Sequence, residues 1–212
     1  MENHYNEAYF EYQKSAGILS GKINSLFIKD FIRKDDRVLD FGCGGGFVLN
    51  NLNCKEKIGI EINPVAAAVA HENGVKVYRT VDELPDDFAD VVISVHVLEH
   101  THNPLSELKG LFRILKKGGR AVIIVPCESI KWKYKDNDID QHLYTWSPLC
   151  IGNLMKLAGF EVSESKPCPC RWFRPFRDSF IKMFGYGSYF RLCKIYGHFG
   201  PLSQIRVVAS KK

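Results

Sequence analysis

Two acidic side chains accompany a cluster of glycines in the first third of the chain. Asp40 precedes the glycine-rich residues 42–46, and Glu61 follows Asp40 by 21 positions, at the end of the next apolar segment. Glycines let the backbone approach a ligand closely, and a helix that starts after them offers free N–H groups. A carboxylate beside such a loop repels a pyrophosphate but suits an ammonium or sulfonium charge, and an acid at the second strand end can accept both hydroxyls of a ribose. The pattern therefore predicts a positively charged ribonucleoside without phosphate, which is S-adenosylmethionine.

A second group of polar residues contains three histidines. His96, Glu99 and His100 follow a predicted buried strand, and His142 lies in the loop after the next strand. Transfer of a methyl group from a sulfonium needs an aligned acceptor and a group, often histidine or carboxylate, that takes the acceptor's proton. We therefore predict His142, His100 and His96 as catalytic residues. The spacing H-x-x-E-H also matches a zinc-protease signature, but that motif lies within a helix and this one leaves a strand.

The elements that must position these residues alternate between apolar strands and helices. We expect strands near residues 38–41, 57–61, 75–78, 90–95, 121–125, 160–162 and 204–209. We expect helices over residues 5–34, 47–52, 65–71, 104–118 and 147–159. The alternation predicts an α/β fold with a Rossmann-like, doubly wound and mostly parallel sheet that has helices on both faces.

The glycine loop and the strands around it resemble a known family. Residues 38–46 read VLDFGCGGG and resemble the first motif of class I S-adenosylmethionine-dependent methyltransferases, and residues 58–64 read IGIEINP and resemble their second. Four further segments are similar to the branch of ubiquinone-biosynthesis-type enzymes that act on small molecules: residues 89–94, 98–100, 115–119 and 142–160. The resemblance covers about residues 35–165 and, with the last strand, most of the chain. It implies a seven-stranded sheet whose last strand runs antiparallel between its neighbours.

The resemblance also implies a role for each cofactor residue. Asp40 would lie near the amine of the methionyl part, which Gly42 and Gly44 would face, and Glu61 would hold the ribose. Ile62 would flank the adenine. The predicted cofactor-binding residues are Asp40, Gly42, Cys43, Gly44, Glu61, Ile62, Thr80, Val81, Ser94 and His96.

The adenine and sulfonium ends of the cofactor have further candidates. Ser94 and His96 leave the fourth strand and would lie near the sulfonium. The family often has an acid that binds the adenine amine where this chain has Thr80. The adenine contact then falls to the backbone of Thr80 and Val81, or to Asp82.

The histidines also allow a metal-assisted hypothesis. Some methyltransferases that act on ribose or catechol hydroxyls resemble the pattern E-x-x-E-H with a later histidine and use a divalent cation. Here His96, Glu99, His100 and His142 would form a mixed nitrogen and oxygen ligand set able to polarise a hydroxyl. A structural or general-base role is favoured, so no metal ion is predicted.

Residues 166–203 stand apart in composition. They contain ten aromatic residues, seven bases and one acid, which gives this segment a net charge of +6 and leaves −1 for the rest of the chain. We expect a helical insertion before the last strand whose aromatics mostly pack on the core. Its charge suits a lid over an anionic substrate, a membrane-surface patch or a subunit interface, and the lid is the favoured interpretation. Residues 1–34 are expected to form a helical cap, with four aromatics covering the cofactor: Tyr5, Tyr9, Phe10 and Tyr12.

Length and composition limit the classes of protein to which this chain could belong. A chain of 212 residues, 45% of them hydrophobic, predicts a single domain with a packed core. A net charge of +5 does not by itself argue for nucleic acid, and neither a signal peptide nor a transmembrane segment is expected. Seven irregularly spaced cysteines disfavour a disulfide framework and favour the cytoplasm. Composition leaves the oligomeric state open.

The preferred functional hypothesis is methyl transfer to a small or medium-sized acceptor. Oxygen is favoured because histidines suit deprotonation of a hydroxyl, and a sugar or lipid-linked acceptor with an anionic group is our preferred substrate. DNA is disfavoured because residues 94–96 read SVH in place of the Asp/Asn-Pro-Pro-Tyr/Phe arrangement that cradles exocyclic amines. Three alternatives stay open: a non-catalytic methyltransferase-like binding protein, a metal-assisted hydroxyl methyltransferase that includes an RNA ribose target, and a nicotinamide-dependent oxidoreductase. Phe47 and Asp40 count against the last, because the dinucleotide fingerprint needs glycine at position 47.

Overall fold

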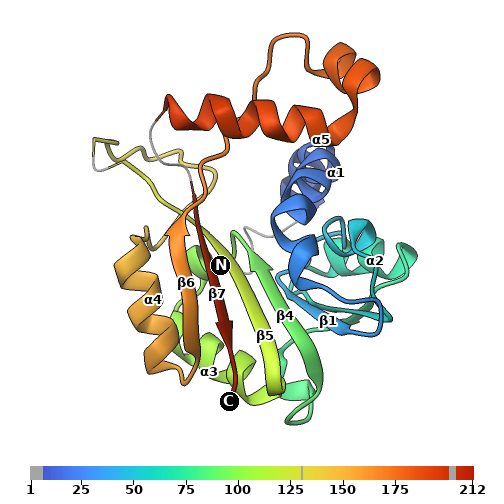
Figure 1. The fold of residues 1–212 in the computed structure, drawn as a ribbon, viewed down its shortest axis with the longest axis vertical. Helices are drawn as coiled ribbons and strands as arrows, with labels where there is room; N and C mark the ends of the chain where they lie inside the picture. Colours follow the sequence, from blue (N-terminus) through green and yellow to red (C-terminus); the bar gives the residue numbers. More distant parts are fainter. Residues whose placement is uncertain (1–6, 130, 201–203) are drawn as a thin grey trace.

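The fold is built on one mixed sheet (Figure 1). The computed structural model of the protein describes residues 7–129, 131–200 and 204–212. The strands are β1 (Arg37–Phe41), β2 (Glu56–Ile60), β3 (Lys76–Tyr78), β4 (Ala89–Val95), β5 (Leu115–Pro126), β6 (Glu161–Pro167) and β7 (Gln204–Ser210). They form a seven-stranded sheet in the order β3-β2-β1-β4-β5-β7-β6. The pairs β1–β2, β1–β4, β2–β3 and β4–β5 are parallel, and β7 runs antiparallel to both β5 and β6. This is the predicted topology, with the last strand inserted between its neighbours.

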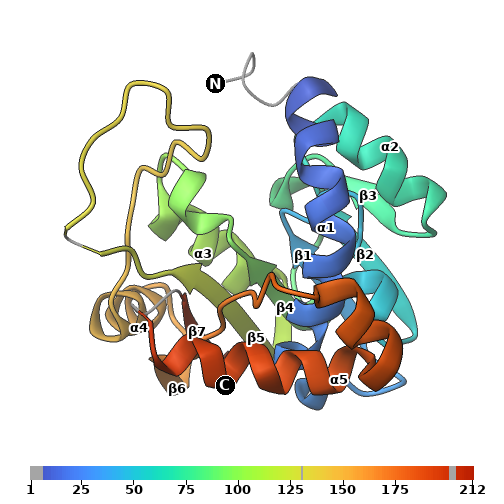
Figure 2. The ribbon, with the colours of Figure 1, turned by 90° about the horizontal axis from the view of Figure 1, so that it is seen from above.

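Helices cover both faces of the sheet (Figure 2). The α-helices are α1 (Glu7–Ile28), α2 (Pro64–Glu72), α3 (Pro104–Ile114), α4 (Pro148–Leu157) and α5 (Arg177–His198). One core cluster joins α3 and α4 to side chains such as Leu39 of β1, and the other joins α1, α2 and α5 to side chains such as Val38. Neighbouring residues of a strand therefore face different cores, as expected of a strand buried on both sides.

Three helices begin where local sequence signals place them. The side chains of Asn63, Asn103 and Ser147 accept hydrogen bonds from backbone N–H groups of the first helical turn, at 3.0 to 3.1 Å. Each cap is followed by a proline at the first helical position: Pro64, Pro104 and Pro148. Because a proline there loses no helical hydrogen bond, these starts depend on local chemistry alone.

Three predicted helix boundaries were wrong. The helix expected to reach Gly118 ends at Ile114, and residues 115–119 begin β5, because the Gly118 N–H donates to the Lys211 carbonyl (2.7 Å) and the Lys211 N–H donates to the Gly119 carbonyl (3.2 Å). The helix expected over residues 47–52 is only the 3-10 turn η2 (Leu49–Asn51). The first helix does not reach residue 34; it ends in the 3-10 turn η1 (Lys29–Phe31).

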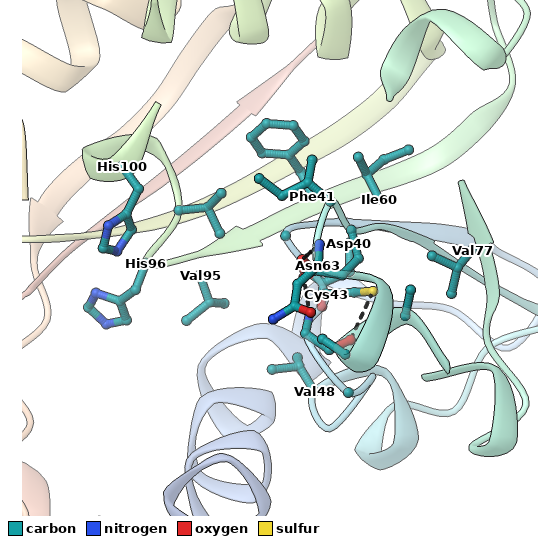
Figure 3. Close-up of a pocket in the computed structure, with 18 of the residues that line it drawn as sticks. Asp40, Phe41, Cys43, Val48, Ile60, Asn63, Val77, Val95, His96 and His100 are labelled. Atoms are coloured by element: carbon teal, nitrogen blue, oxygen red, sulfur yellow. Dashed lines mark hydrogen bonds between the residues drawn. The ribbon is translucent and has the colours of Figure 1, made fainter. Parts of the chain in front are cut away.

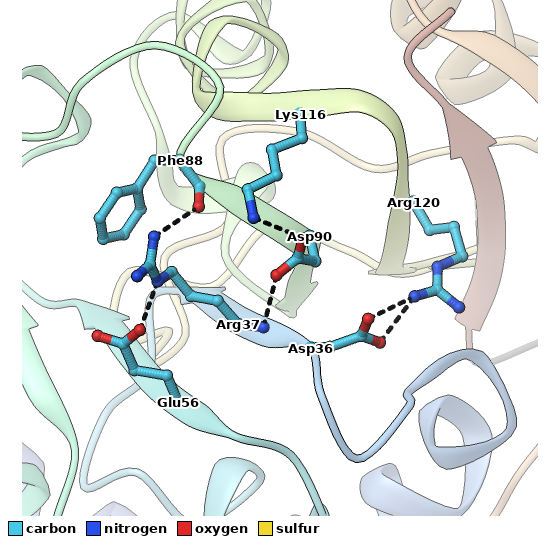
Figure 4. Close-up of polar contacts among 7 residues, drawn as sticks. All are labelled: Asp36, Arg37, Glu56, Phe88, Asp90, Lys116 and Arg120. Atoms are coloured by element: carbon cyan, nitrogen blue, oxygen red, sulfur yellow. Dashed lines mark hydrogen bonds and ion pairs between the residues drawn. The ribbon is translucent and has the colours of Figure 1, made fainter.

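The amino-terminal edge of the sheet is closed by ion pairs (Figure 4). The Arg120 guanidinium donates to both oxygens of Asp36 (2.9 and 2.7 Å), and Asp90 accepts from Lys116 Nζ (2.7 Å) and from the Arg37 backbone N–H (2.8 Å). Burial alone would raise the pKa of Asp90, but these two hydrogen bonds lower it overall. Polar groups at this edge are therefore engaged with each other and hold the strands in register.

The insertion before β7 is helical, as expected, and consists of two helices merged at a kink. Gly185 interrupts α5 with φ 76° and ψ 168°. The second half packs on α1 through an edge-to-face contact of Phe27 and Phe190 (4.6 Å between ring centroids), and the buried Tyr189 donates its hydroxyl to the Phe173 carbonyl (3.0 Å). The expectation that most aromatics of residues 166–203 pack on the core holds only in part, because four of the ten are exposed: Phe176, Phe184, Tyr186 and Phe199.

The predicted cover of the cofactor by N-terminal aromatics falls outside the description. Tyr5 lies outside the described residues, and Tyr9, Phe10 and Tyr12 are described only as helical backbone of α1. Across the described residues, no helix is both long and apolar enough to cross a membrane.

Candidate cofactor and acceptor site

A tight glycine loop follows β1 at the carboxyl-terminal edge of the sheet. The N–H groups of Gly42 and Cys43 both donate to the Ile60 carbonyl (2.9 and 3.1 Å), which fastens the loop to β2. Gly42 has φ 77°, and a Cβ there would lie 2.3 Å from Val97. Gly44 has φ 51° and open space where a Cβ would be, so it offers bare backbone to a ligand. The loop is therefore held by backbone bonds and by close packing that only glycine permits.

Asp40 lies at the end of β1 under this loop. Its side chain is buried, and the Oδ1 atom has no hydrogen-bond partner. Burial raises the pKa of this carboxyl well above its usual range, and the nearby Glu61 carboxylate raises it further. A buried carboxylate without a partner is costly unless a positive group compensates it. Asp40 is therefore suited to bind an ammonium group that enters the cavity beside the loop.

Glu61 follows β2, and its carboxylate is held at two points. Oε2 accepts from the Gly44 N–H and Oε1 accepts from the Asn63 N–H, both at 2.8 Å. Burial raises the pKa of this carboxyl, and the backbone N–H donors partly oppose the rise. An ionised carboxylate has about four acceptor positions, so each oxygen keeps capacity for one hydroxyl donor. This matches the two hydroxyls of a ribose.

Residues predicted at the adenine end lie on the rim of the same cavity. Ile62 is exposed, and Thr80, Val81 and Asp82 line the cavity with it. The Thr80 N–H already donates to Glu83 Oε1 (2.8 Å). Of the predicted adenine contacts, the Thr80 N–H is thus used within the chain, and the Val81 carbonyl accepts from Arg113 (2.8 Å), which leaves the Val81 N–H and the Asp82 carboxylate.

One cavity joins the glycine loop to the histidines (Figure 3). It has a volume of about 1670 Å³, and its lining runs from Asp40 and Glu61 to His96 and His100. Pockets for a single small ligand usually measure about 300–1,000 Å³. The cavity therefore has room for a nucleoside cofactor and an acceptor side by side.

Helix α1 supplies lining residues that the sequence analysis missed. Gly17, Ser20, Gly21 and Asn24 face the cavity. A Cβ at Gly21 would lie 2.5 Å from the Phe47 carbonyl oxygen, so the helix approaches the glycine loop closely. The signal in the sequence was the pair of glycines four residues apart within a helical segment, which is typical of close helix packing.

Ser94 does not line this cavity. Its side chain is fully buried, and its hydroxyl donates to the Phe41 carbonyl (3.1 Å). The structure therefore does not place Ser94 beside the sulfonium, where the sequence analysis expected it. Ser94 instead ties β4 to the end of β1, directly before the glycine loop.

His96 follows β4 in a strained backbone conformation. Its φ is 55°, its N–H donates to the Ile124 carbonyl (2.9 Å), and its Nε2 lies 3.1 Å from Gln204 Oε1. Burial lowers the pKa of His96, but Glu99, 3.5 Å from Nδ1, together with Gln204 and Asp140 outweighs this effect, so the pKa is raised overall. His96 therefore binds its proton more tightly than an ordinary histidine does. Sequence analysis missed Gln204, because only the pairing of β7 with β5 brings it here.

The pKa of His100 is shifted in the opposite direction and is lowered overall. Burial lowers its pKa, the Glu99 carboxylate partly opposes this, and a positive charge on His142 would lower it further. His100 is therefore neutral near pH 7, as a proton acceptor must be. His142 does not line the cavity; its ring lies behind that of His100, 4.8 Å between centroids, and its Nδ1 bonds to Glu128 Oε1.

Three of the four predicted metal ligands converge. Ligand atoms of Glu99, His100 and His142 all lie within 4.8 Å of one another, and His96 is outside this group. Glu99 is fully buried, and neither of its carboxylate oxygens has a hydrogen-bond partner. His142 is oriented by Glu128, an arrangement typical of histidines that bind metal.

A family model described as a methyltransferase domain matches residues 10–165. The chain belongs to the class I S-adenosylmethionine-dependent methyltransferases. It is 37% identical over 97 residues to the ubiquinone biosynthesis O-methyltransferase of Pseudomonas fluorescens, a match that covers 40% of this chain and 41% of that protein. The chain thus matches less than half the length of this curated relative.

Solved structures of similar fold agree with this family. A SAM-dependent methyltransferase of Thermotoga maritima, titled a possible histamine N-methyltransferase, has a TM-score of 0.71 at 21% identity and covers 100% of both chains. A SAM-dependent methyltransferase of Archaeoglobus fulgidus has a TM-score of 0.67 at 18% identity, over 96% of this chain and 99% of that one. At these identities the likeness shows the shared fold.

The methyl donor of this family, S-adenosylmethionine, fits the residues that this chain presents. The unpartnered Asp40 suits its ammonium group, the open backbone at Gly44 leaves room for its methionyl part, and Glu61 has free acceptor capacity for its ribose. A pyrophosphate would meet the carboxylate of Asp40, so the site disfavours a dinucleotide. The nicotinamide alternative has no support in this geometry.

Proposed function

We propose that this methyltransferase transfers a methyl group from S-adenosylmethionine to a hydroxyl oxygen of a small or medium-sized polar acceptor. The observation that carries the proposal is the single cavity of about 1670 Å³ in which Asp40 and Glu61 lie at one end and His100 at the other. A sugar or a lipid-linked sugar suits the polar lining at the acceptor end, which includes Thr101 and Asn103.

The chain's own residues have separable tasks. When bound, S-adenosylmethionine supplies a methyl group on a positively charged sulfur. Asp40 holds the ammonium group and Glu61 holds the ribose, which fixes the sulfur relative to the cavity. His100, neutral near pH 7, accepts the proton of the acceptor hydroxyl through a ring nitrogen. Alignment of the two reactants supplies most of the acceleration.

The basic insertion does not argue for an anionic acceptor. Among the described residues that line the cavity, Trp172 comes from the segment of residues 166–203, whereas none of that segment's seven bases does. Of the favoured interpretation of this segment as a basic lid, only the contact of the aromatic Trp172 with the cavity is therefore supported. Trp172 offers a flat apolar surface that suits a sugar ring.

The proposal is tested by a methyl-acceptor screen. Purified protein and S-adenosylmethionine are incubated with fractionated cell metabolites, lipids and RNA, and products are sought by mass spectrometry as a gain of one methylene. We expect a product with a methylated hydroxyl. Methylation at nitrogen would contradict the oxygen assignment, and tight cofactor binding without product in any fraction would favour the non-catalytic alternative.

His100→Gln separates catalysis from binding. We expect this variant to bind S-adenosylhomocysteine as the wild type does and to lose about 100- to 10,000-fold in kcat, the usual contribution of a general base. His198→Gln, on the exposed side of α5, is the matched control and should keep its kcat. Unchanged turnover of His100→Gln would remove His100 from the catalytic residues.

A metal-assisted variant of the same reaction is the second candidate. The buried Glu99 carboxylate, neither oxygen of which accepts a hydrogen bond, favours it, together with the convergence of Glu99, His100 and His142 and the orientation of His142 by Glu128. These three residues would hold a divalent cation that polarises the hydroxyl, and His100 would then be a ligand in place of a base.

Chelation decides between the two candidates. Turnover is measured after treatment with EDTA and again after Mg²⁺, Mn²⁺ or Zn²⁺ is added back, alongside S-adenosylhomocysteine binding. Loss and recovery of turnover with unchanged cofactor binding would support the metal. Full turnover in EDTA would exclude it and leave His100 as the base.

A further inference from the structure

Helix α5 and the residues that flank it (174–199) carry exposed apolar side chains together with bases. We name this the α5 outer surface and define it by nine residues: Arg174, Phe176, Lys182, Met183, Phe184, Arg191, Lys194, Ile195 and Phe199. Its five apolar side chains are between 56% and 86% exposed. Figure 1 shows α5 lying across the end of the molecule toward which β4 points.

The outer surface is distinct from the side of α5 that packs on the protein. In the second half of the helix, Tyr189, Cys193 and Gly197 are buried at four-residue spacing. Arg191 and Ile195 are exposed, each two residues from Cys193 and thus on the opposite side. In this half of the helix, the exposed Ile195 is therefore not part of the core contact, which the opposite side makes.

The bases of this surface have no acidic partners in the part of the chain that the structure describes. Arg177 pairs with Asp178, the one acid in residues 166–203. No carboxylate among the described residues lies within ion-pair distance of Arg174, Lys182 or Arg191, although all three are exposed. The positive charge is therefore available to an external anion.

We propose that the α5 outer surface binds the anionic headgroup surface of a lipid bilayer, with its apolar side chains inserted among the acyl chains. A lipid surface accepts both kinds of group at once: phosphates pair with the bases, and hydrocarbon takes up Phe176, Met183 and Phe199. A second copy of the chain would place one net positive segment against another, and an RNA would leave the aliphatic side chains in water.

This inference goes beyond the proposed function and does not depend on which acceptor is methylated. It has a consequence for that acceptor, because Trp172 belongs to the segment that leads into α5 and also lines the cavity. An enzyme bound through α5 would hold the cavity close to the lipid surface. A lipid-linked acceptor would then reach His100 without leaving the bilayer.

The test is co-sedimentation of the full chain with vesicles. Vesicles of phosphatidylcholine alone are compared with vesicles of phosphatidylcholine mixed with phosphatidylglycerol, at low and at rising salt. We expect sedimentation with the anionic vesicles that weakens as salt increases, and little with the neutral ones. Because the readout needs neither cofactor nor acceptor, its failure is separate from a failure of the methyl-transfer proposal.

A charge-reversal variant and a matched control locate the surface. Arg174→Glu, Lys182→Glu and Arg191→Glu are combined in one variant, and Lys109→Glu, Lys117→Glu and Lys156→Glu in the other, so that both change the net charge equally. Each base near a lipid surface contributes about fivefold in affinity. We therefore expect the first variant to lose at least ~100-fold and the second to bind close to the wild type.

The apolar part of the surface is tested by Phe176→Ser with Met183→Ser. These two side chains are exposed, so folding should be unaffected, as measured by thermal unfolding of all variants. We expect weaker binding to anionic vesicles with an unchanged salt dependence. Equal binding by the α5 charge variant and its control, no sedimentation of the wild type, or a dimer in solution that the same substitutions dissolve would each overturn the proposal.

Discussion

Two carboxyl groups beside one glycine loop have different environments and therefore different tasks. Glu61 accepts two backbone N–H groups, so its orientation is fixed before any ligand arrives. Asp40 is buried with an oxygen that no donor reaches. The first is a preformed acceptor for hydroxyls, and the second is an uncompensated site for a cation.

Asp40 makes the stability of the unliganded protein depend on pH. Because its pKa is raised in the folded state, the folded protein keeps a proton that the unfolded chain releases. Stability must therefore fall as pH rises from the ordinary aspartate pKa, about 4, to the raised folded value, and it is not affected below that window. We expect Asp40→Asn to reduce this fall, leaving the part that the raised pKa of Glu61 contributes, and to be more stable than the wild type at pH 7. Urea unfolding across this pH range measures both effects.

The same substitution should weaken cofactor binding. An ammonium–carboxylate hydrogen bond contributes about 1.5–3 kcal/mol, so S-adenosylhomocysteine should bind Asp40→Asn roughly 10- to 100-fold less tightly in calorimetry. Asp86→Asn, on an exposed turn, is the matched control. A less stable Asp40→Asn with normal affinity would show that the carboxylate serves the fold and not the ligand.

At the scale of elements, local chemistry was predictable and long-range pairing was not. The cap and proline pairs at Asn63, Asn103 and Ser147 carry their own signal, and the three helices begin there. The end of α3 carries no such local signal, because residues 115–119 become strand through pairing with Ala89 and through bonds to Lys211, nearly a hundred positions away.

The candidate site follows the same division. Asp40, Glu61 and the glycines between them are close in sequence, and the structure groups them as the spacing suggested. Gln204 and Glu128, which orient His96 and His142, could not be predicted, because the β7 register and the loop after β5 place them. No sequence signal indicated that the Ser94 hydroxyl would bond to the Phe41 carbonyl and that Ser94 would not line the cavity.

The glycine loop is the element on which cofactor affinity should depend most steeply. Gly42→Ala meets two costs: about 1–2 kcal/mol for a left-handed residue with a Cβ, and the contact with Val97 at 2.3 Å. We expect a loss of about 3 kcal/mol in the free energy of unfolding and at least tenfold weaker binding of S-adenosylhomocysteine.

Gly74→Ala is the control for the backbone cost alone. Its φ of 78° matches that of Gly42, but a Cβ there meets nothing within 4 Å. It should lose only about 1 kcal/mol of stability and no affinity. Adding Val97→Ala to Gly42→Ala should restore part of the loss, and no recovery would place the cost in the backbone instead of the packing.

At the scale of the whole molecule, the two edges of the sheet have separate uses. The amino-terminal edge pairs its charges, as in Asp36 with Arg120 and Asp90 with Lys116. The carboxyl-terminal edge leaves an oxygen of Asp40 without a hydrogen-bond donor and faces a large cavity. Ligands of open α/β sheets bind outside the carboxyl ends of the strands, so stability and ligand binding should respond to different substitutions.

Arg120→Met tests this separation. The Asp36 side chain is nearly buried, and without Arg120 it keeps only the Arg33 N–H as a donor (2.7 Å). Leaving a carboxylate that is largely buried without its counter-ion should lower the free energy of unfolding by about 2–3 kcal/mol in urea titrations. Lys117→Met, at an exposed position of β5, should lose under about 0.5 kcal/mol. Binding of S-adenosylhomocysteine should stay within about twofold of the wild type in both variants, because the affected edge lies across the full length of the strands from the glycine loop. A large fall in affinity with Arg120→Met would mean that the ion pairs set the geometry of the cofactor cradle and that the two edges are coupled.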